Sequence, residues 1–227
     1  EGQRDLFLMK YLVYIKFEMD ENLASKAGEL MAKFHEIANK FESDKPRLKI
    51  DIDYLINNPL KTILSYQPSI EIQGYPEAFE KMADYAKKAL SSLSFSEDAF
   101  GLIHGDFGIH NIFVNEKQDI SIFDFDLCGY GLKAFDIATF QVFLPWEEED
   151  PTQINAFVTG YNKIRRISQD EHTAIKLFKN FIRTIWGIGY YITLAPILGL
   201  QYFEGELERI LRRVTNRFIK ELEDISA

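Results

Sequence analysis

The chain contains one cysteine, Cys128, and few glycines or prolines. Among its 227 residues there are 13 glycines and 7 prolines. A single cysteine excludes an intrachain disulfide and a thiol-rich zinc site, and it suits a reducing, cytoplasmic environment. The low glycine and proline content excludes collagen-like and low-complexity classes. Because 46% of the residues are hydrophobic, the sequence is predicted to fold into one large globular domain or two small ones.

Positive charge is in the minority. The chain has 26 Lys and Arg residues against 35 Asp and Glu residues, which gives a formal net charge of −9. A protein that binds nucleic acid needs clustered basic residues, so we expect no nucleic-acid partner. The sequence begins with Glu1 and shows no charged segment followed by an apolar stretch. We therefore expect no signal peptide, and the sequence is compatible with a fragment of a longer protein.

Only one long uncharged segment is present, at residues 184–203. Its length alone would allow it to cross a membrane. However, it contains Pro196 and Gln201, and the chain has no second segment of this kind. We therefore expect a buried helix that Pro196 breaks or kinks, and no membrane partner.

The hydrophobic pattern predicts an α+β domain that is mainly helical. The expected elements are a strand or strand pair at 6–17, helices at 21–41, about 53–64, 76–93 and 204–225, a helix that starts at Asp150-Pro151, and short strands at 100–103, 111–114 and 120–125. Asp20 is a plausible N-cap for the helix from residue 21. That helix is predicted to bury one stripe and to place His35 on its surface. The stripe comprises Leu23, Ala27, Leu30, Met31, Phe34, Ile37, Ala38 and Phe41.

Polar residues gather around the short strands. Asp106 and Asn111 lie on either side of a loop, and Asp124 lies at the end of the following strand. The polar turn at residues 115–118 joins two strands into a hairpin, which should bring Asn111 and Asp124 close to one cation. Carboxylate and amide oxygens are hard ligands that suit Mg²⁺. The sequence therefore predicts a magnesium site beside Asp106.

Two other interpretations of these residues are open. Asp106 and Asp124 could be turn and strand-end residues that accept backbone N–H bonds. A metal-dependent phosphoesterase could use His104, His110 and the two aspartates, although two-metal hydrolases require more ligands from several loops. The presence of Asn111 and the flanking strands favours the magnesium site.

The segment HGDFGIHN resembles the catalytic loop of protein-kinase-like enzymes, and IFDFD resembles their metal-binding segment. Gly105, where protein kinases usually have arginine, and the run FDFDLCGYGLKAFDIA are similar to the aminoglycoside phosphotransferase and choline-kinase group of small-molecule kinases. GELMAKFH resembles the helix that follows the nucleotide-binding lobe in that group. The resemblance extends over residues 6–220 and is most specific over His104–Asp136. Asp126 departs from the pattern, because a small residue is usual there.

This resemblance implies the mainly helical C-terminal lobe of the protein-kinase-like fold, with an inserted β-hairpin that carries the catalytic and metal loops. It implies that Asp106 accepts the proton of an attacking hydroxyl and that Asn111 and Asp124 hold Mg²⁺ with ATP or another nucleoside triphosphate. His104 would support the metal segment, and Asp136 would accept N–H bonds from the catalytic loop. The substrate would be a small molecule with a hydroxyl group, such as an aminoglycoside, choline, homoserine or a sugar derivative.

A kinase of this type also needs a nucleotide-binding lobe with a glycine-rich loop, and none precedes residue 100. We therefore expect residues 1–20 to be the last strand and hinge of an absent lobe and residues 21–227 to be the catalytic and substrate-binding lobe. Alone, this chain should be inactive. Lys10 with Glu29 or Glu36 imitates the lysine–glutamate pair of such a lobe without the further strands it requires.

The family resemblance does not identify the substrate-binding residues. The aromatic residues Trp186, Tyr190 and Tyr191 lie in a segment that could line a substrate pocket, although such a stripe is more often part of the core. A non-catalytic kinase-like module that binds a ligand or partner is the alternative to the enzyme. The sequence predicts no oligomeric state.

Overall fold

The computed structural model of the chain describes residues 17–41, 44–144, 151–197 and 204–226. Nearly all of the strand predicted at 6–17, including Lys10, lies outside these residues. The acidic run Glu147–Asp150 also lies outside them.

The described residues form an α+β domain that is mainly helical, as predicted. The helices are α1 (Glu21–Ala38), α2 (Asn58–Ser65), α3 (Glu77–Ser91), α4 (Ala134–Val142), α5 (Pro151–Asn162), α6 (Gln169–Phe181), α7 (Gly187–Ile197) and α8 (Glu204–Ser226). Short π-helical segments, η1 (Asp53–Asn57) and η4 (Ile182–Trp186), precede α2 and α7. The strands are β1 (Leu48–Ile50), β2 (Phe100–Ile103), β3 (Ile112–Val114), β4 (Ile120–Ile122) and β5 (Gly129–Leu132).

Helix α1 begins where the sequence predicts. The Asp20 carboxylate accepts the Leu23 N–H at 2.8 Å, which satisfies one of the free N–H groups of the first turn. Two residues of the predicted stripe are exposed instead of buried, because Ile37 is 72% exposed and Phe41 is 41% exposed. The buried positions of α1 are residues 23, 24, 27, 28, 31, 32, 35 and 38. Helical spacing therefore places His35 inside and Ile37 outside, and Phe41 lies beyond the end of the helix.

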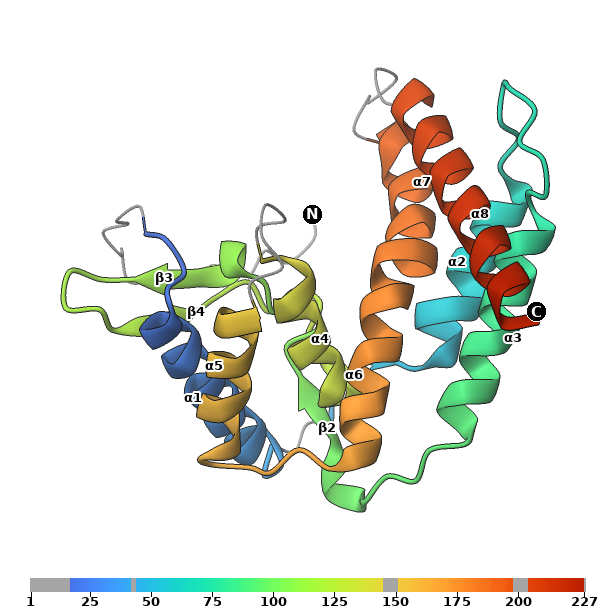
Figure 1. Ribbon diagram of the computed structural model, residues 1–227. Helices are drawn as coiled ribbons and strands as arrows, with labels where there is room; N and C mark the ends of the chain where they lie inside the picture. The colour runs from blue at the N-terminus through green and yellow to red at the C-terminus, as the bar shows by residue number, and fades with distance from the viewer. Residues whose placement is uncertain (1–16, 42–43, 145–150, 198–203, 227) are drawn as a thin grey trace.

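Helices α1 and α5 lie side by side in Figure 1 and approach so closely that their backbones touch. A Cβ atom added at Gly28 would lie 2.0 Å from the Phe157 carbonyl oxygen, and one added at Gly160 would lie 2.0 Å from the Ser25 carbonyl oxygen. The two glycines, one on each helix, therefore make the close crossing possible.

The strands form two small sheets. In the first, β5 lies between β1 and β2, parallel to β1 and antiparallel to β2. The second is the predicted hairpin of β3 and β4, with Ile112 opposite Ile122. Sequence patterns did not indicate β1 or β5. β1 lies in a mixed segment just after Pro46, and two of the four residues in β5 are glycines, which are depleted in strands. The strand that leads into the predicted catalytic loop, β2, therefore belongs to a different sheet from the hairpin that follows the loop.

The long uncharged segment is helical over its described part. It comprises η4 from Thr184 onward and α7, and Pro196 lies in the last turn of α7. Ile185 and Ile188 are buried, whereas Tyr190 is 45% exposed. Within the described ranges, none of the helices combines the length and apolar character that a membrane crossing requires.

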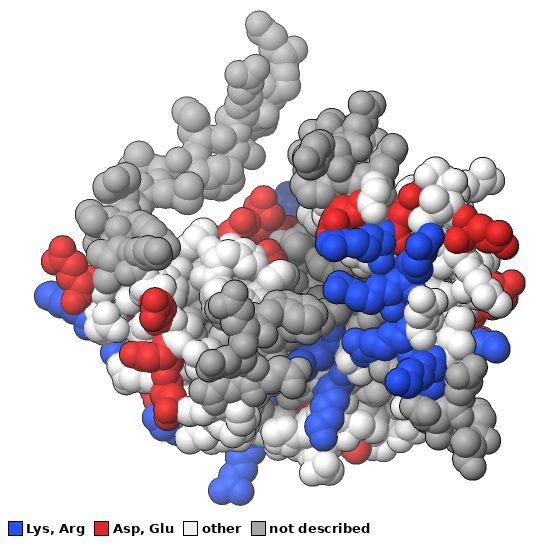
Figure 2. Space-filling model, turned by 45° about the horizontal axis from the view of Figure 1, so that its top comes forward, with Lys and Arg blue, Asp and Glu red and all other residues white. Residues whose placement is uncertain are grey.

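The elements form two groups on either side of α4 and α6 (Figure 1). Helices α1 and α5 and the β3–β4 hairpin form one group, and α2, α3, α7 and α8 form the other. Figure 2 shows Lys and Arg side chains gathered on one half of the visible face. Helix α8 contributes the exposed residues Arg209, Arg212, Arg213 and Arg217. Positive charge is therefore concentrated locally, although the net charge of the chain is negative.

Candidate active site

The predicted catalytic loop runs from the end of β2 to the start of β3. Within it, Asp106 and Asn111 are in direct contact. The Asn111 side-chain Nδ2 donates to the Asp106 carbonyl oxygen at 2.8 Å and to the Asp106 Oδ2 atom at 3.0 Å. Asn111 is 3% exposed, and 26% of the Asp106 side chain is exposed. The loop therefore fixes a carboxylate at its surface through a buried amide.

Asp136, in the first turn of α4, holds the start of this loop. It is fully buried, its Oδ2 atom accepts the His104 N–H at 2.8 Å, and its Oδ1 atom accepts the Gly105 N–H at 2.8 Å. Hydrogen bonds to an ionised acceptor are stronger than neutral ones. Gly105 has a positive φ of 83°, a conformation that glycine adopts at little cost, so the loop turns here toward Asp106.

His104 links the loop to the segment that follows β4. Its Nε2 atom lies 3.0 Å from the Phe123 carbonyl oxygen, and its Nδ1 atom accepts the Asp106 N–H at 3.3 Å. Since one ring nitrogen accepts, the other must carry the proton that is donated to Phe123. The His104 ring also contacts the Phe125 ring, with their centroids 4.7 Å apart.

Asp124 lies two residues after the end of β4, close to the Asn111 end of the hairpin. The N–H of its neighbour Phe123 donates to the Asn111 carbonyl oxygen at 3.2 Å, so the two ends of the hairpin meet. Asp124 has a φ of 62°, which is uncommon outside glycine and is tolerated best by Asp and Asn. Its side chain is exposed and makes no hydrogen bond or ion pair with the described residues. Asp126, two residues on, is also exposed.

His110 lies next to Asp106. Its Nε2 atom is 3.3 Å from the Asp106 Oδ2 atom, and 46% of its side chain is exposed. Hydrogen bonding to Asp106 raises the pKa of His110, against the smaller lowering effect of partial burial. The charges of Asp106 and Asp124 both favour the protonated imidazole.

His35 is a member of this site that the sequence analysis placed wrongly on a helix surface. It is fully buried, its Nε2 atom is 2.9 Å from the Asp136 Oδ2 atom, and its Nδ1 atom is 2.8 Å from the Tyr161 hydroxyl. Burial lowers the pKa of His35, against the raising effect of Asp136. The one available signal was its spacing of four and seven residues from the buried Met31 and Gly28.

A partly buried ionic cluster lies behind His35, with Arg165, Lys133 and Glu171 buried and the Asp98 side chain 52% exposed. Arg165 Nε donates to the Asp98 carboxylate at 2.7 Å. Its Nη1 atom forms an ion pair with Glu171 Oε1 at 2.8 Å and reaches the Tyr161 hydroxyl at 3.5 Å. Lys133, which is fully buried, lies 3.1 Å from Asp98. Desolvation raises the pKa of Asp98, but the hydrogen bonds to Arg165 and Lys133 and the charges of these residues together outweigh it, so the pKa of Asp98 is lowered. A continuous polar network thus extends from Asp98 to the catalytic loop.

Clusters of His, Cys, Asp and Glu side chains from several loops are the usual metal sites of metal-dependent hydrolases. The described residues contain no group of three or more such side chains placed to hold a metal ion. The phosphoesterase alternative needs a cluster of this kind, and no observation favours it.

The fold is that of small-molecule kinases with the protein-kinase-like architecture. The chain is similar to amicoumacin kinase hAmiN in complex with AMP-PNP, Ca²⁺ and Ami (TM-score 0.68, 20% identity, covering 88% of this chain and 60% of that one). It is also similar to a microcompartment-associated aminopropanol kinase (TM-score 0.66, 17% identity, 89% and 64%). A choline/ethanolamine kinase family protein from Mesorhizobium loti is a further structural match (TM-score 0.63, 16% identity, 85% and 61%).

Residues 11–175 match the model of the phosphotransferase enzyme family, APH, and the chain belongs to that family. An uncharacterized protein of Synechocystis sp. is 25% identical over 191 residues, which are 81% of this chain and 51% of that protein. An uncharacterized protein of Deinococcus radiodurans is 26% identical over 206 residues, with 88% and 58% coverage. The chain thus spans little more than half the length of these relatives.

Proposed function

We propose that the protein is an ATP- and Mg²⁺-dependent phosphotransferase that phosphorylates a hydroxyl group of a small polar molecule. The observation that carries this proposal is that the two ends of the β3–β4 hairpin are hydrogen-bonded to each other. The N–H of Phe123, which precedes Asp124, donates to the Asn111 carbonyl oxygen, and the Asn111 side chain donates to Asp106. Membership of the phosphotransferase family supports the reaction class.

In the proposed reaction, Asp106 orients the hydroxyl of the substrate and accepts its proton. The hydroxyl oxygen forms a bond to the γ-phosphorus of ATP, and the bond from that phosphorus to the bridging β–γ oxygen breaks. The products are a phosphate ester and ADP. The partly exposed carboxylate of Asp106 is accessible for this task, and its contact with buried Asn111 limits its movement. Such positioning lowers the entropic part of the barrier.

Asn111 and Asp124 are the residues that we propose to hold the metal. The Asn111 side-chain nitrogen donates to Asp106. This leaves the Asn111 Oδ1 oxygen as the atom that would bind Mg²⁺, and amide oxygens suit this ion. The exposed Asp124 carboxylate supplies the negatively charged ligand. Bound magnesium would neutralise charge on the β- and γ-phosphate oxygens.

Asp136 and His104 would act as positioning residues for this reaction. Asp136 fixes the backbone on the N-terminal side of Asp106, and His104 ties that backbone to Phe123, which precedes Asp124. Electrostatic catalysis depends on groups that are held in place before the reaction begins. We assign no residue to substrate binding.

The proposal includes a division of labour along the chain. Residues 21–227 would form the catalytic and substrate-binding lobe, and residues 1–20 would belong to the end and hinge of a nucleotide-binding lobe. The match to about 60% of amicoumacin kinase is consistent with this division. We further propose a cytoplasmic location and a small hydroxyl compound as the partner, with choline-like, aminoglycoside-like and sugar-like molecules as the first candidates.

The proposal is tested with Asp106→Asn in the longest natural chain. The amide keeps the size of the side chain but cannot accept the proton, so turnover should fall by about 10²–10⁴. ATP consumption is measured with Mg²⁺ across a panel that contains choline, homoserine, an aminoglycoside and simple sugars. Asp119→Asn, in the turn of the same hairpin, is the matched control and should keep full turnover.

Two results would contradict this function. Unchanged turnover in Asp106→Asn would exclude Asp106 as the base. No ATP consumption with any acceptor of the panel would favour the non-catalytic module that binds a ligand or partner.

A further inference from the structure

A cavity lies apart from the candidate active site. It has a volume of about 900 Å³, within the range of pockets that hold small molecules. It opens between the β1–β5–β2 sheet and helices α3 and α6, and none of Asp106, Asn111, Asp124, His104 and Asp136 lines it. Its wall includes Ile50. The Ile50 side chain also reaches the catalytic loop, because a Cβ atom added at Gly105 would lie 3.0 Å from Ile50 Cδ1. The cavity therefore lies behind the catalytic loop, with Ile50 between them.

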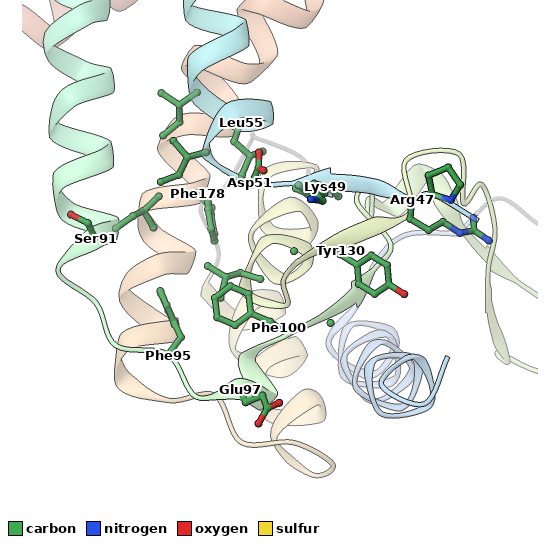
Figure 3. Close-up of a pocket in the computed structure, with 18 of the residues that line it drawn as sticks. Arg47, Lys49, Asp51, Leu55, Ser91, Phe95, Glu97, Phe100, Tyr130 and Phe178 are labelled. Atoms are coloured by element: carbon green, nitrogen blue, oxygen red, sulfur yellow. The ribbon is translucent and has the colours of Figure 1, made fainter. Parts of the chain in front are cut away.

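One end of this cavity is apolar. Figure 3 shows Phe95, Phe100, Phe178 and Leu55 directed into it. Phe100 is 51% exposed, although its ring packs edge-on against Phe95 with centroids 6.0 Å apart. Phe95 is half-buried, and Phe178 and Leu55 are nearly buried, at 3% and 5% exposure. The apolar wall therefore consists of core side chains with the exposed Phe100 at its edge, and an apolar concave wall of this kind is typical of small-molecule sites.

The other end is basic. Lys49 lies on β1 and Arg47 just before it, away from the phenylalanine end (Figure 3). The Arg47 guanidinium lies 5.6 Å from the centroid of the Phe41 ring. The parallel register places Lys49 beside Tyr130 of β5, which is 42% exposed and adds a hydroxyl group to this end. Lys45 also lines the cavity.

Two carboxylates line the cavity as well, and one of them, Asp51, is two residues from Lys49 and offsets part of the positive charge there. Asp51 accepts the Tyr54 N–H at 3.0 Å, so its carboxylate caps the following helical segment. Glu97 lies at the far side from Arg47 and Lys49 (Figure 3). The basic end therefore keeps an excess of positive charge over its single carboxylate.

We propose that this cavity binds an amphipathic anion, a molecule with a flexible hydrocarbon part and one carboxylate head. The hydrocarbon part lies among Phe95, Phe100 and Phe178. The carboxylate pairs with Arg47 and Lys49, and the Tyr130 hydroxyl is a further donor. The site is separate from phosphoryl transfer and does not depend on the proposed function.

The test is calorimetric titration of the longest natural chain with decanoate, below the concentration at which decanoate forms micelles. Saturable binding with one site per chain is expected. Decan-1-ol and decyltrimethylammonium have the same hydrocarbon chain but no anionic head. Each should bind at least about tenfold more weakly than decanoate, because each loses a charged contact with the basic end. Equal binding of decan-1-ol and decanoate would contradict the role of the basic end, and no saturable binding of decanoate would overturn the proposal.

Variants locate the site. Arg47→Glu combined with Lys49→Glu should weaken decanoate binding at least about tenfold. The control, Lys81→Glu combined with Lys117→Glu, makes the same change in charge at exposed positions outside the cavity and should leave the affinity unchanged. Ser91→Trp should block the cavity, because Ser91 is an exposed lining residue at the end of α3. Undiminished binding in both the charge variant and Ser91→Trp, with each folded by circular dichroism, would place decanoate elsewhere and refute the proposal.

Discussion

At the scale of single residues, Asp124 combines an exposed carboxylate with a left-handed backbone. A φ of 62° costs a non-glycine residue on the order of 1 kcal/mol. Strained residues of this kind often occur at functional sites. Here the backbone conformation directs the chain away from the hairpin just after Phe123 bonds to Asn111.

Asp124→Asn separates the charge of this residue from its conformation. Asparagine also tolerates a positive φ, so the fold should persist, whereas the loss of the charged ligand should weaken Mg²⁺-dependent nucleotide binding at least about tenfold. The measurement is titration of the longest natural chain with ATP at fixed Mg²⁺. Asp119→Asn is again the control. Normal affinity in Asp124→Asn would count against the metal assignment.

His35 gives the stability of the protein a predictable pH dependence. His35 is faced by Asp136 of α4, Tyr161 of α5, Arg165 of the segment after α5, and Lys133. Burial is the largest effect on this histidine and lowers its pKa below 6.5. Between that lowered pKa and 6.5, the unfolded chain binds a proton that the folded chain does not bind. The contribution of His35 to the free energy of unfolding should therefore be fully present above about pH 6.5 and should decrease as the pH falls toward the folded-state pKa.

Urea unfolding between pH 5 and pH 7.5 measures this effect. In His35→Gln the decrease between pH 7 and pH 5.5 should be smaller than in the parent, although the variant is less stable overall because it loses buried hydrogen bonds. His172→Gln, at a half-buried position on α6, should keep the slope of the parent. An identical slope in His35→Gln and the parent would show that His35 is not the group responsible.

At the scale of elements, the crossing of α1 and α5 determines where His35 lies. The close approach at Gly28 and Gly160 brings Tyr161, the residue after Gly160, to the His35 ring. Phe157, on the same helix, stacks on Phe140 of α4 with ring centroids 4.1 Å apart. The helix pair and α4 thus form one packed unit beneath the catalytic loop.

Gly28→Ala should be destabilising by about 1–3 kcal/mol, because the new methyl group would overlap the backbone of α5. Gly205→Ala is the matched control, since a Cβ atom at Gly205 in α8 would meet nothing within 4 Å. In a helix, that exchange should be neutral or stabilising by up to about 1 kcal/mol. Chemical denaturation of both variants measures the difference. Equal stability of Gly28→Ala and the parent would contradict the close crossing.

At the scale of the whole molecule, our proposal is that the chain would provide one side of the reaction. The catalytic loop, the metal segment and their supports lie within residues 104–136, whereas the sequence before Phe100 has no glycine-rich loop for phosphates. Its fold covers about 60% of the related kinase hAmiN. Nucleotide binding is therefore expected to require more chain than residues 21–227.

The isolated segment 21–227 should bind Mg²⁺–ATP at least about tenfold more weakly than the longest natural chain. The physical reason is that most contacts to the adenine and phosphates would come from the other lobe. Calorimetric titration of both forms measures the difference, and circular dichroism verifies that the segment is folded. Equal affinities would refute the division into lobes.

The sequence by itself determined the elements with strong periodic patterns and the local motifs. Asp20 caps α1 as expected, and the β3–β4 hairpin forms from the two strands on either side of its polar turn. The order and spacing of Asp106, Asn111 and Asp124 were also sufficient to indicate the family. These features depend on residues near one another in the chain, and such interactions can be read from spacing.

Only the tertiary structure determined the environment of His35, the pairing of β1 with β5, and the cavity between the sheet and α3. His35 lies 101 positions from Asp136 and 126 from Tyr161, and β1 joins a strand about eighty positions away. Contacts over such separations depend on how whole elements pack, and a local pattern contains no record of that packing. Helical spacing places His35 on the same face of α1 as Gly28 and Met31, but only the packing of α4 and α5 determines that Asp136 and Tyr161 meet it there.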